Sequence, residues 1–249
     1  PDDRRLSAVP PIAEGDRPLP RARLRPPALR TLQRDRLLRT LGSGPGHRLT
    51  LVTGPAGSGK TTLLAQFVAH HAGPTAWYRA DVDDVAPGVL LDHVSRALAA
   101  VVPDLPGGWR SVDDAVAALD AGRTRPDPEG STVLLAVDDL HVIVGSEAEQ
   151  VLGQVVDALP PWLHLAATCR AAPRWNLSRL RVSGALLEIG ADDLRFRSWE
   201  VERLFGDVYR EPLPPGDLAQ LTRGLEGWAA GLQLFHLATR EKPVSERRR

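Results

Sequence analysis

Five short apolar runs alternate along the chain with longer segments in which apolar residues recur at helical spacing. The runs are apolar at nearly every position, as strands must be when a parallel sheet is covered on both faces. The segments between them repeat an apolar residue every three or four positions and predict amphipathic helices packed on that sheet. We therefore expect strands over residues 49–53, 75–78, 132–137, 163–168 and 185–189, and helices over 28–41, 60–71, 88–102, 112–119 and 147–159.

The pattern changes at both ends of the chain and at two glycine-rich stretches. Prolines recur among arginines before residue 28 and predict extended, poorly packed backbone, whereas residues 42–46 and 122–130 predict a helix break and a linker. After Phe196 the strands cease, and helices over 198–208, 215–223 and 227–240 predict a small helical appendage. The expected organisation is a linker or arm over 1–27, an α/β domain over 28–190, a helical lid subdomain over 191–241 and a charged tail over 242–249.

Composition excludes several classes of protein. Apolar residues make up 43% and charged residues 25%, as in globular proteins, and no apolar run approaches the roughly 18 residues of a membrane helix. Cys169 is the single cysteine, which excludes internal disulfides and predicts, without a secretory leader, a cytoplasmic protein. The 31 basic and 31 acidic residues balance, so no broad attraction to nucleic acid or membranes is expected. Methionine is absent even at position 1, which an excised initiator or an origin within a longer protein explains equally well.

A phosphate-binding loop stands directly after the first expected strand and directly before a helix. Residues 54–61 match the pattern G-x-x-x-x-G-K-[ST] without a mismatch. Its glycines allow successive backbone N–H groups to turn inward around an anion, and the following helix start adds a partial positive charge. Lys60 is expected to reach the β- and γ-phosphates, and the Thr61 hydroxyl to bind Mg²⁺. The expected nucleotide-binding residues here are Gly54, Pro55, Ala56, Gly57, Ser58, Gly59, Lys60 and Thr61.

Acidic and basic residues follow the next two buried strands. Asp138 is expected to hold Mg²⁺, and Asp139 to orient or deprotonate the attacking water. Taken alone, two aspartates in this position more commonly begin a turn, and the phosphate loop upstream favours the metal site. Arg170 follows the next strand at the same edge of the sheet, where open α/β sheets bind ligands. It is therefore a candidate sensor of the γ-phosphate, and a surface arginine is the alternative.

Other chemically active side chains favour structural roles. His141 is interpreted as a capping or packing residue, with water positioning as the alternative. The acidic loop at 81–84 is expected to be solvated, and Cys169 to belong to the core. The tryptophans lack the interleaved arginines of a base-stacking platform and are interpreted as core or interface residues: Trp77, Trp162, Trp175, Trp199 and Trp228.

In this order, the motifs resemble one family of regulators. The chain carries GPAGSGKTTLL, WYRAD, VLLAVDDLHVI, HLAATCR, LLEIGADDLRF and GLEGWAAGLQLFHLA. Over about residues 25–240 it resembles the ATPase module of MalT-type transcriptional regulators, large ATP-binding LuxR-family activators of the STAND class. The last motif carries most of the resemblance, because many NTPases share a phosphate loop and an aspartate pair.

The resemblance implies a fold and a set of roles. The fold would be an α/β P-loop NTPase of the ASCE/STAND type, with a five-stranded parallel sheet followed by a small helical subdomain. The module would switch between a closed ADP form and an open ATP form that self-associates. By this similarity, Thr62 joins the phosphate loop, Asp138 and Asp139 are its acidic pair, and Arg170 is its sensor. Arg34 would border the adenine and Trp228 the nucleotide from the lid side.

The predicted function is an ATP/ADP-binding switch module with slow, Mg²⁺-dependent ATP hydrolysis. DNA and inducer would be recognised only through domains outside this chain, as the resemblance implies. Two alternatives stay open at this point: a metabolic enzyme or motor-type ATPase with productive turnover, and a scaffold that binds ADP and never hydrolyses ATP.

Overall fold

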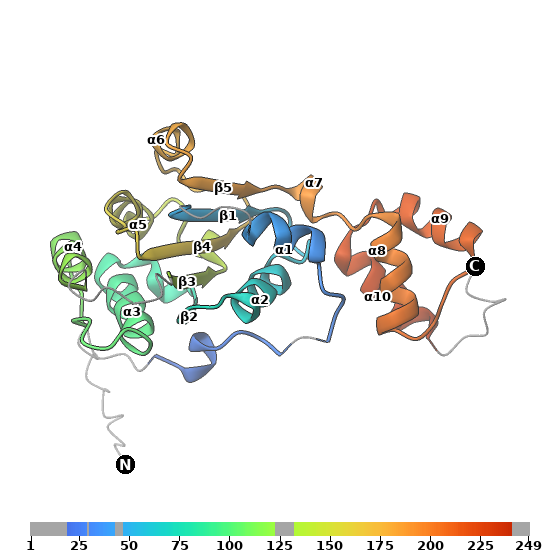
Figure 1. Cartoon of the computed structure of the whole chain (residues 1–249), viewed down its shortest axis with the longest axis horizontal. Coiled ribbons are helices and arrows are strands. Elements are labelled where there is room, and N and C mark those ends of the chain that lie inside the picture. Colours follow the sequence, from blue (N-terminus) through green and yellow to red (C-terminus); the bar gives the residue numbers. More distant parts are fainter. Residues whose placement is uncertain (1–18, 29, 43–46, 123–131, 241–249) are drawn as a thin grey trace, which may run out of the picture.

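A parallel sheet forms the centre of the protein. The computed structural model describes residues 19–28, 30–42, 47–122 and 132–240. Its five strands have the order β2-β3-β4-β1-β5 (Figure 1). They are β1 (Leu49–Thr53), β2 (Thr75–Arg79), β3 (Val133–Asp138), β4 (Leu163–Cys169) and β5 (Leu186–Ile189). The predicted α/β fold with five parallel strands is confirmed, and every strand boundary lies within one residue of its prediction.

The carboxyl ends of the strands meet at one edge of the sheet. Thr53 at the end of β1 is level with Cys169 at the end of β4. On the other side of β4, β3 pairs with β2 so that Asp138 is level with Arg79. Because all these strands run in the same direction, the segments that follow them lie at this one edge, where open α/β sheets bind ligands.

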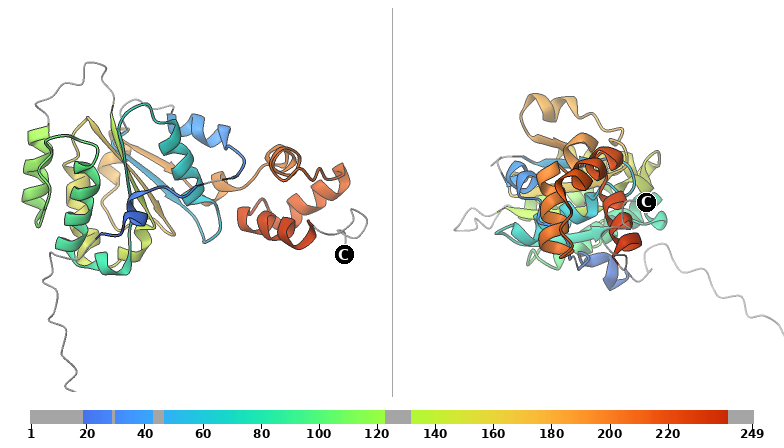
Figure 2. Two further views of the ribbon diagram at one scale, coloured as in Figure 1. Left: turned by 90° about the horizontal axis from the view of Figure 1, so that it is seen from below. Right: turned by 90° about the vertical axis from the view of Figure 1, so that its right-hand side faces the viewer.

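Helices cover both faces of the sheet (Figure 2). One face carries α1 (Asp35–Gly42) and α2 (Lys60–His70). The other carries α3 (Pro87–Ala99), α4 (Val112–Ala121) and α5 (Glu147–Asp157). Successive residues of β3 alternate between the two cores, as the two-residue period of a strand requires. Both faces are therefore buried, which explains the unbroken apolar runs in the sequence.

The helical part after the sheet has a core of its own. It contains α7 (Ala191–Leu194), α8 (Ser198–Arg203), α9 (Pro215–Leu225) and α10 (Ala229–Thr239), and α8 continues as a π-helical turn over Leu204–Val208. A short helix α6 (Ser178–Val182) precedes β5. In Figure 1, α8, α9 and α10 stand to the right of the sheet, beyond α7. We call residues 191–240 the lid. Its core is made by Leu32, Phe196, Val201, Leu204, Phe205 and Leu232.

The segment before α1 differs from its prediction. The expected helix over 28–41 begins only at Asp35, because Gln66 pairs with the backbone of Leu32 and Arg34 in place of helical hydrogen bonds. The described residues before residue 28 are mostly exposed, as predicted, but they are not all extended. Residues Arg21–Leu24 form a 3-10 helix, and Leu24 packs against the larger core. Helix α1 ends at Gly42, where the expected break at 42–46 begins. The rest of that break, most of the linker at 122–130 and the tail at 242–249 lie outside the described residues, as do residues 1–18.

The acidic loop after β2 is not simply solvated. Asp81 caps the 3-10 helix Val82–Val85, whereas Asp84 is fully buried. The Asp84 carboxylate accepts hydrogen bonds from Arg23 and from Nδ1 of His93, the latter at 2.8 Å. Hydrogen bonds and charge overcome the desolvation of this carboxylate and hold the pKa of Asp84 below its usual value. Asp84 thus anchors the N-terminal segment, a long-range contact that local sequence pattern does not reveal.

Candidate functional site

The phosphate loop, residues 54–59, joins β1 to α2. Gly57 and Gly59 have φ angles of 73° and 91°, in the left-handed region that favours glycine. At Gly57 a Cβ atom would also lie 2.6 Å from Cβ of Ala230 on the lid. No side chain caps the first turn of α2, so its backbone N–H groups are left to face the loop. The predicted strand–loop–helix arrangement of an anion site is therefore present.

Lys60 lies at the start of α2 and turns back toward the loop. Its Nζ donates to the carbonyl oxygens of Gly54 and Pro55, each at 2.8 Å. Burial lowers the pKa of Lys60 and Arg170 adds to this, while the charges of Asp139 and Asp138 act in the opposite direction. The ammonium group is thus held against the backbone of the phosphate loop.

Three oxygen atoms converge beside the loop at the ends of β3 and β4. Oδ1 of Asp138 accepts hydrogen bonds from Oγ1 of Thr61 at 2.9 Å and from Oγ1 of Thr168 at 2.7 Å. Burial raises the pKa of Asp138, and the neighbouring Asp139 adds to this, whereas the two hydroxyls favour the charged form. Carboxylate and hydroxyl oxygens are ligands that Mg²⁺ prefers, so this group fits the ion chemically.

The rest of a metal shell would have to come from elsewhere. Within the described residues, no group of three or more His, Cys, Asp or Glu side chains could hold a metal ion. A site with Thr61 and Asp138 as its protein ligands therefore suits Mg²⁺, which usually keeps several waters and binds nucleotide phosphates.

Asp139 is restrained by two neighbouring strands. It adopts the left-handed conformation, with φ of 57°, and its amide donates to Oγ1 of Thr168 at 3.0 Å. Its Oδ2 accepts from Nε of Arg79 at 2.9 Å and lies 2.8 Å from Nη2 of the same guanidinium. Sequence reasoning missed Thr168 and Arg79. Both stand at or next to a strand end on the edge already singled out, and that position was the available signal.

Arg170 and His141 complete this edge of the sheet. Arg170 follows β4 directly and is exposed, and its charge contributes to lowering the pKa of both Lys60 and His141. Burial is the main cause of the lowered pKa of His141. The Nδ1 atom of His141 is buried, lies 3.7 Å from Oδ1 of Asp139, and has no hydrogen-bond partner in the described part of the chain. Arg170 therefore lies near enough to Lys60 and His141 for its charge to act on both, and its role as a sensor stays a prediction.

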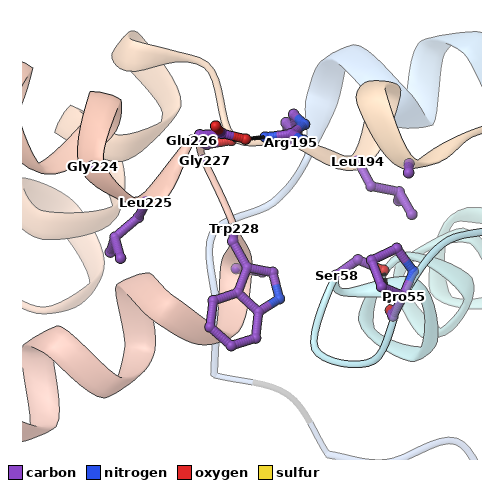
Figure 3. A pocket seen from close by; sticks show the side chains of 11 residues that line it. Pro55, Ser58, Leu194, Arg195, Gly224, Leu225, Glu226, Gly227 and Trp228 are labelled. Carbon is purple, nitrogen blue, oxygen red and sulfur yellow. Dashed lines mark hydrogen bonds and ion pairs between the residues drawn. The ribbon is translucent and has the colours of Figure 1, made fainter.

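A cavity of about 340 Å³ lies between the phosphate loop and the lid (Figure 3). Trp228 borders it, with its indole about two-fifths exposed and Nε1 donating to the carbonyl of Ala56 at 3.2 Å. The amide of Ala230, at the start of α10, donates to the carbonyl of Gly57 at 2.9 Å. The lid therefore contacts the phosphate loop directly. The cavity is lined by Pro55, Ser58, Ala191, Leu194, Arg195, Gly224, Leu225, Glu226, Gly227, Trp228 and Ala229.

Gly227 explains how the lid motif turns Trp228 toward the loop. Its φ of 70° favours glycine, and a Cβ there would lie 2.3 Å from the carbonyl oxygen of Phe196. Glu226 forms an ion pair with Arg195 at 2.5 Å, at the rim of the cavity (Figure 3). The chain thus passes close to its own connection between sheet and lid before α10 begins.

Arg34 does not take the place that the resemblance implied. It is not among the residues that line the cavity, and its guanidinium is buried against Glu200 and backbone carbonyls of the connection to the lid. Its three guanidinium nitrogens are all engaged in the joint between the two parts of the protein. The guanidinium of Arg34 is therefore not free for the contact with adenine that the resemblance implied.

Comparisons with known proteins agree with this geometry. The family model of the AAA ATPase domain matches residues 26–167. The HTH-type transcriptional regulator MalT of Yersinia enterocolitica is 33% identical over an alignment of 221 residues, and the match covers 85% of this chain and 24% of that protein. MalT of Yersinia pestis gives the same values. The chain therefore spans about a quarter of the length of these relatives.

Solved structures support the fold. A STAND protein with a tetratricopeptide repeat sensor from Pyrococcus horikoshii superposes with a TM-score of 0.54 at 16% sequence identity. The superposition covers 91% of this chain and 31% of the Pyrococcus horikoshii chain. A Walker-type ATPase of Pyrococcus abyssi gives 0.51 at 14% identity, covering 86% and 69%.

No helix in the described ranges is long and apolar enough to cross a membrane. The similarity to MalT-type regulators that the motifs indicated is confirmed across most of the sequence. With its family model covering more than half of its length, this chain belongs to the AAA ATPase domain family.

Proposed function

We propose that this chain is the ATP/ADP-binding switch module of a STAND-class signal-transducing ATPase within a MalT/LuxR-type transcriptional regulator. The observation that carries the proposal is the direct contact between lid and phosphate loop, made by Trp228 on Ala56 and by Ala230 on Gly57. A lid that contacts the phosphate loop itself can respond to whether a nucleotide is bound there and which one.

The residues around the loop supply the binding chemistry. Lys60 and the free N–H groups of α2 would hold the phosphates, and Trp228 would border the nucleotide from the lid. Thr61 and Asp138 would hold Mg²⁺, which when bound neutralises phosphate charge. The complete proposed nucleotide-binding set is Gly54, Pro55, Ala56, Gly57, Ser58, Gly59, Lys60, Thr61, Thr62 and Trp228.

Hydrolysis in this proposal is slow and resets the switch. Asp139 would orient or deprotonate the attacking water, and Arg170 would sense the γ-phosphate. The pairing of Asp139 with Arg79 supports slow turnover, since Oδ2 of the carboxylate is already engaged by two guanidinium nitrogens and must leave them before it can accept from a water. The same pairing favours a second candidate, a scaffold that holds ADP without hydrolysis. Asp139→Asn separates the two, because it abolishes phosphate release only if there is release to lose.

Nucleotide identification is the primary test. The purified protein is denatured, any released nucleotide is identified by chromatography, and Lys60→Ala is treated in the same way. A ligand at one hundred times its Kd adds about 2.7 kcal/mol, which corresponds to roughly 5 to 10 °C in Tm for a chain of this size. We expect ADP and ATP to raise the Tm of the wild type by this amount and to leave that of Lys60→Ala unchanged. Equal shifts in both proteins would contradict the assignment of the phosphate site.

Assembly and DNA recognition belong to the same proposal. We propose that the module self-associates in its ATP state, and that inducer and DNA are recognised through other domains of a longer regulator. Light scattering after size-exclusion chromatography, with ATP and with ADP, measures the first point. A mass that is the same with either nucleotide would contradict self-association of this module.

A further inference from the structure

A buried ion pair joins the segment before α1 to the lid. Nε of Arg34 donates to Oε1 of Glu200 at 2.9 Å, and Nη2 lies 3.4 Å from Oε2. The two side chains are only 5% and 1% exposed. Glu200 also caps α8, because its Oε2 accepts from the amide of Arg197 at 2.9 Å. Oε2 of Glu200 also lies 3.5 Å from Nη2 of Arg36, and the buried charge of Arg34 depends on Glu200, since neither of these two side chains can turn to water instead.

The same guanidinium holds the connection between the sheet and the lid. Its two terminal nitrogens donate to the carbonyl of Leu194 at 3.2 and 3.1 Å, and Nη2 also donates to the carbonyl of Arg195 at 3.2 Å. Its Cζ lies 3.9 Å from the centre of the Phe196 ring. Helix α7 ends at Leu194, so at least the first of these carbonyls has no partner within the helix. Arg34 thus fixes the backbone at the point where the chain enters the lid.

The segment that carries Arg34 is also bound to α2, the helix that begins at the phosphate loop. Gln66 of α2 donates through Nε2 to the carbonyl of Leu32 at 2.8 Å and accepts from the amide of Arg34 at 3.0 Å. Gln66 is 8% exposed. Its amide group therefore binds the backbone on both sides of residue 33 and ties Arg34 to the helix of the phosphate loop.

We propose that Arg34 is a positioning residue that holds the lid against the phosphate loop, with Gln66 and Glu200 as its anchors. The held connection continues to the loop, because the amide of Phe196 donates to the carbonyl of Gly227 at 2.8 Å, directly before Trp228. The consequence for nucleotide retention rests on the proposed function. With the lid held, ADP leaves slowly, and with Arg34 altered it leaves faster.

Hydrogen–deuterium exchange on the nucleotide-free protein tests the positioning role without any ligand. Arg34→Lys keeps the positive charge and removes the planar guanidinium with its several hydrogen bonds. Glu200→Gln keeps the shape of the side chain and removes its negative charge. We expect both to speed exchange of peptides covering residues 228–232 about tenfold, while peptides over β3 stay protected. Arg203→Gln is the matched control, since Arg203 pairs with Asp35 across the same joint at 3.2 Å but with side chains 45% and 35% exposed. It should change exchange less than twofold.

Nucleotide release is the second readout. Stopped-flow measurement with a fluorescent ADP analogue should show dissociation about tenfold faster in Arg34→Lys, with the association rate constant unchanged. Unchanged exchange at 228–232 in both variants would overturn the proposal. Loss of protection throughout the sheet in both would overturn it as well, because the pair would then support the whole fold. If the wild type binds no nucleotide but exchange rises locally, the positioning role stands and the proposed function fails.

Discussion

Arg79→Gln removes the guanidinium that holds Oδ2 of Asp139, and we expect it to raise the rate of ATP hydrolysis. In the structure this carboxylate oxygen is engaged by two nitrogens of Arg79, at 2.9 and 2.8 Å. Oδ2 in this pairing must be released before it can orient or deprotonate a water. The free energy of the pairing therefore adds to the barrier for hydrolysis, and the substitution removes that addition.

The exposure of the pair determines the expected magnitude. The side chains of Arg79 and Asp139 are 60% and 23% exposed. Ion pairs open to water contribute about 0.2 to 1 kcal/mol. Since a tenfold rate change corresponds to about 1.4 kcal/mol, the turnover number should rise about 1.4- to 5-fold.

Steady-state phosphate release at saturating ATP and Mg²⁺ measures this effect, with ATP affinity determined separately. Arg181→Gln is the control, because it removes an arginine of similar exposure that pairs with Glu188 at 2.7 Å, beside β5. The substitution should also have no effect in an Asp139→Asn background. A turnover number that is unchanged or lower in Arg79→Gln, with ATP bound, would refute the reasoning.

Three further substitutions test other parts of the structure. Gly57→Ala places a Cβ on a residue with a φ of 73°, 2.6 Å from Cβ of Ala230. The affinity for ADP, measured by calorimetry, should therefore fall at least about tenfold. An affinity equal to that of the wild type would contradict the inference that a side chain at residue 57 strains the phosphate loop. Thr168→Val removes the hydroxyl that donates to Asp138 and accepts from the amide of Asp139. It should lower the free energy of unfolding in urea by about 2 kcal/mol, whereas Thr168→Ser, which keeps the hydroxyl, should lower it much less. Burial lowers the pKa of His164 from 6.5 to about 4, so this histidine stabilises the fold above pH 6.5 and loses that contribution as the pH falls toward 4. His164→Gln should therefore make the free energy of unfolding fall less steeply between pH 6.5 and about pH 4. The same pH dependence in the variant and the wild type would contradict the lowered pKa of His164.

The sheet and the phosphate loop could be predicted because their signals are local. A strand buried on both faces shows an unbroken apolar run, and a loop that turns N–H groups inward needs glycines at fixed positions. The same holds for Asp138, which directly ends such a run. These features required no knowledge of which distant segments meet.

The supporting contacts could not be predicted because they join positions far apart in the chain. Arg34 and Glu200 are 166 positions apart, and Arg79 and Asp139 are 60 apart. The spacing of apolar residues around each of these side chains does not indicate which distant residue it pairs with. The burial of Asp84 was missed for the same reason, since its partner Arg23 stands 61 positions earlier. The late start of α1 also follows from such a contact, the pairing of Gln66 with the backbone at Leu32 and Arg34.

Leu32 has a consequence for how the protein can be dissected. It is one of the buried residues of the lid core, although it precedes the whole sheet in sequence. A fragment beginning at residue 191 would lack this side chain and expose the apolar surface that it covers, so we expect such a fragment to be insoluble or unfolded. Contacts between such distant positions also slow folding. The lid should therefore complete its folding last, after the sheet has brought the N-terminal segment into place.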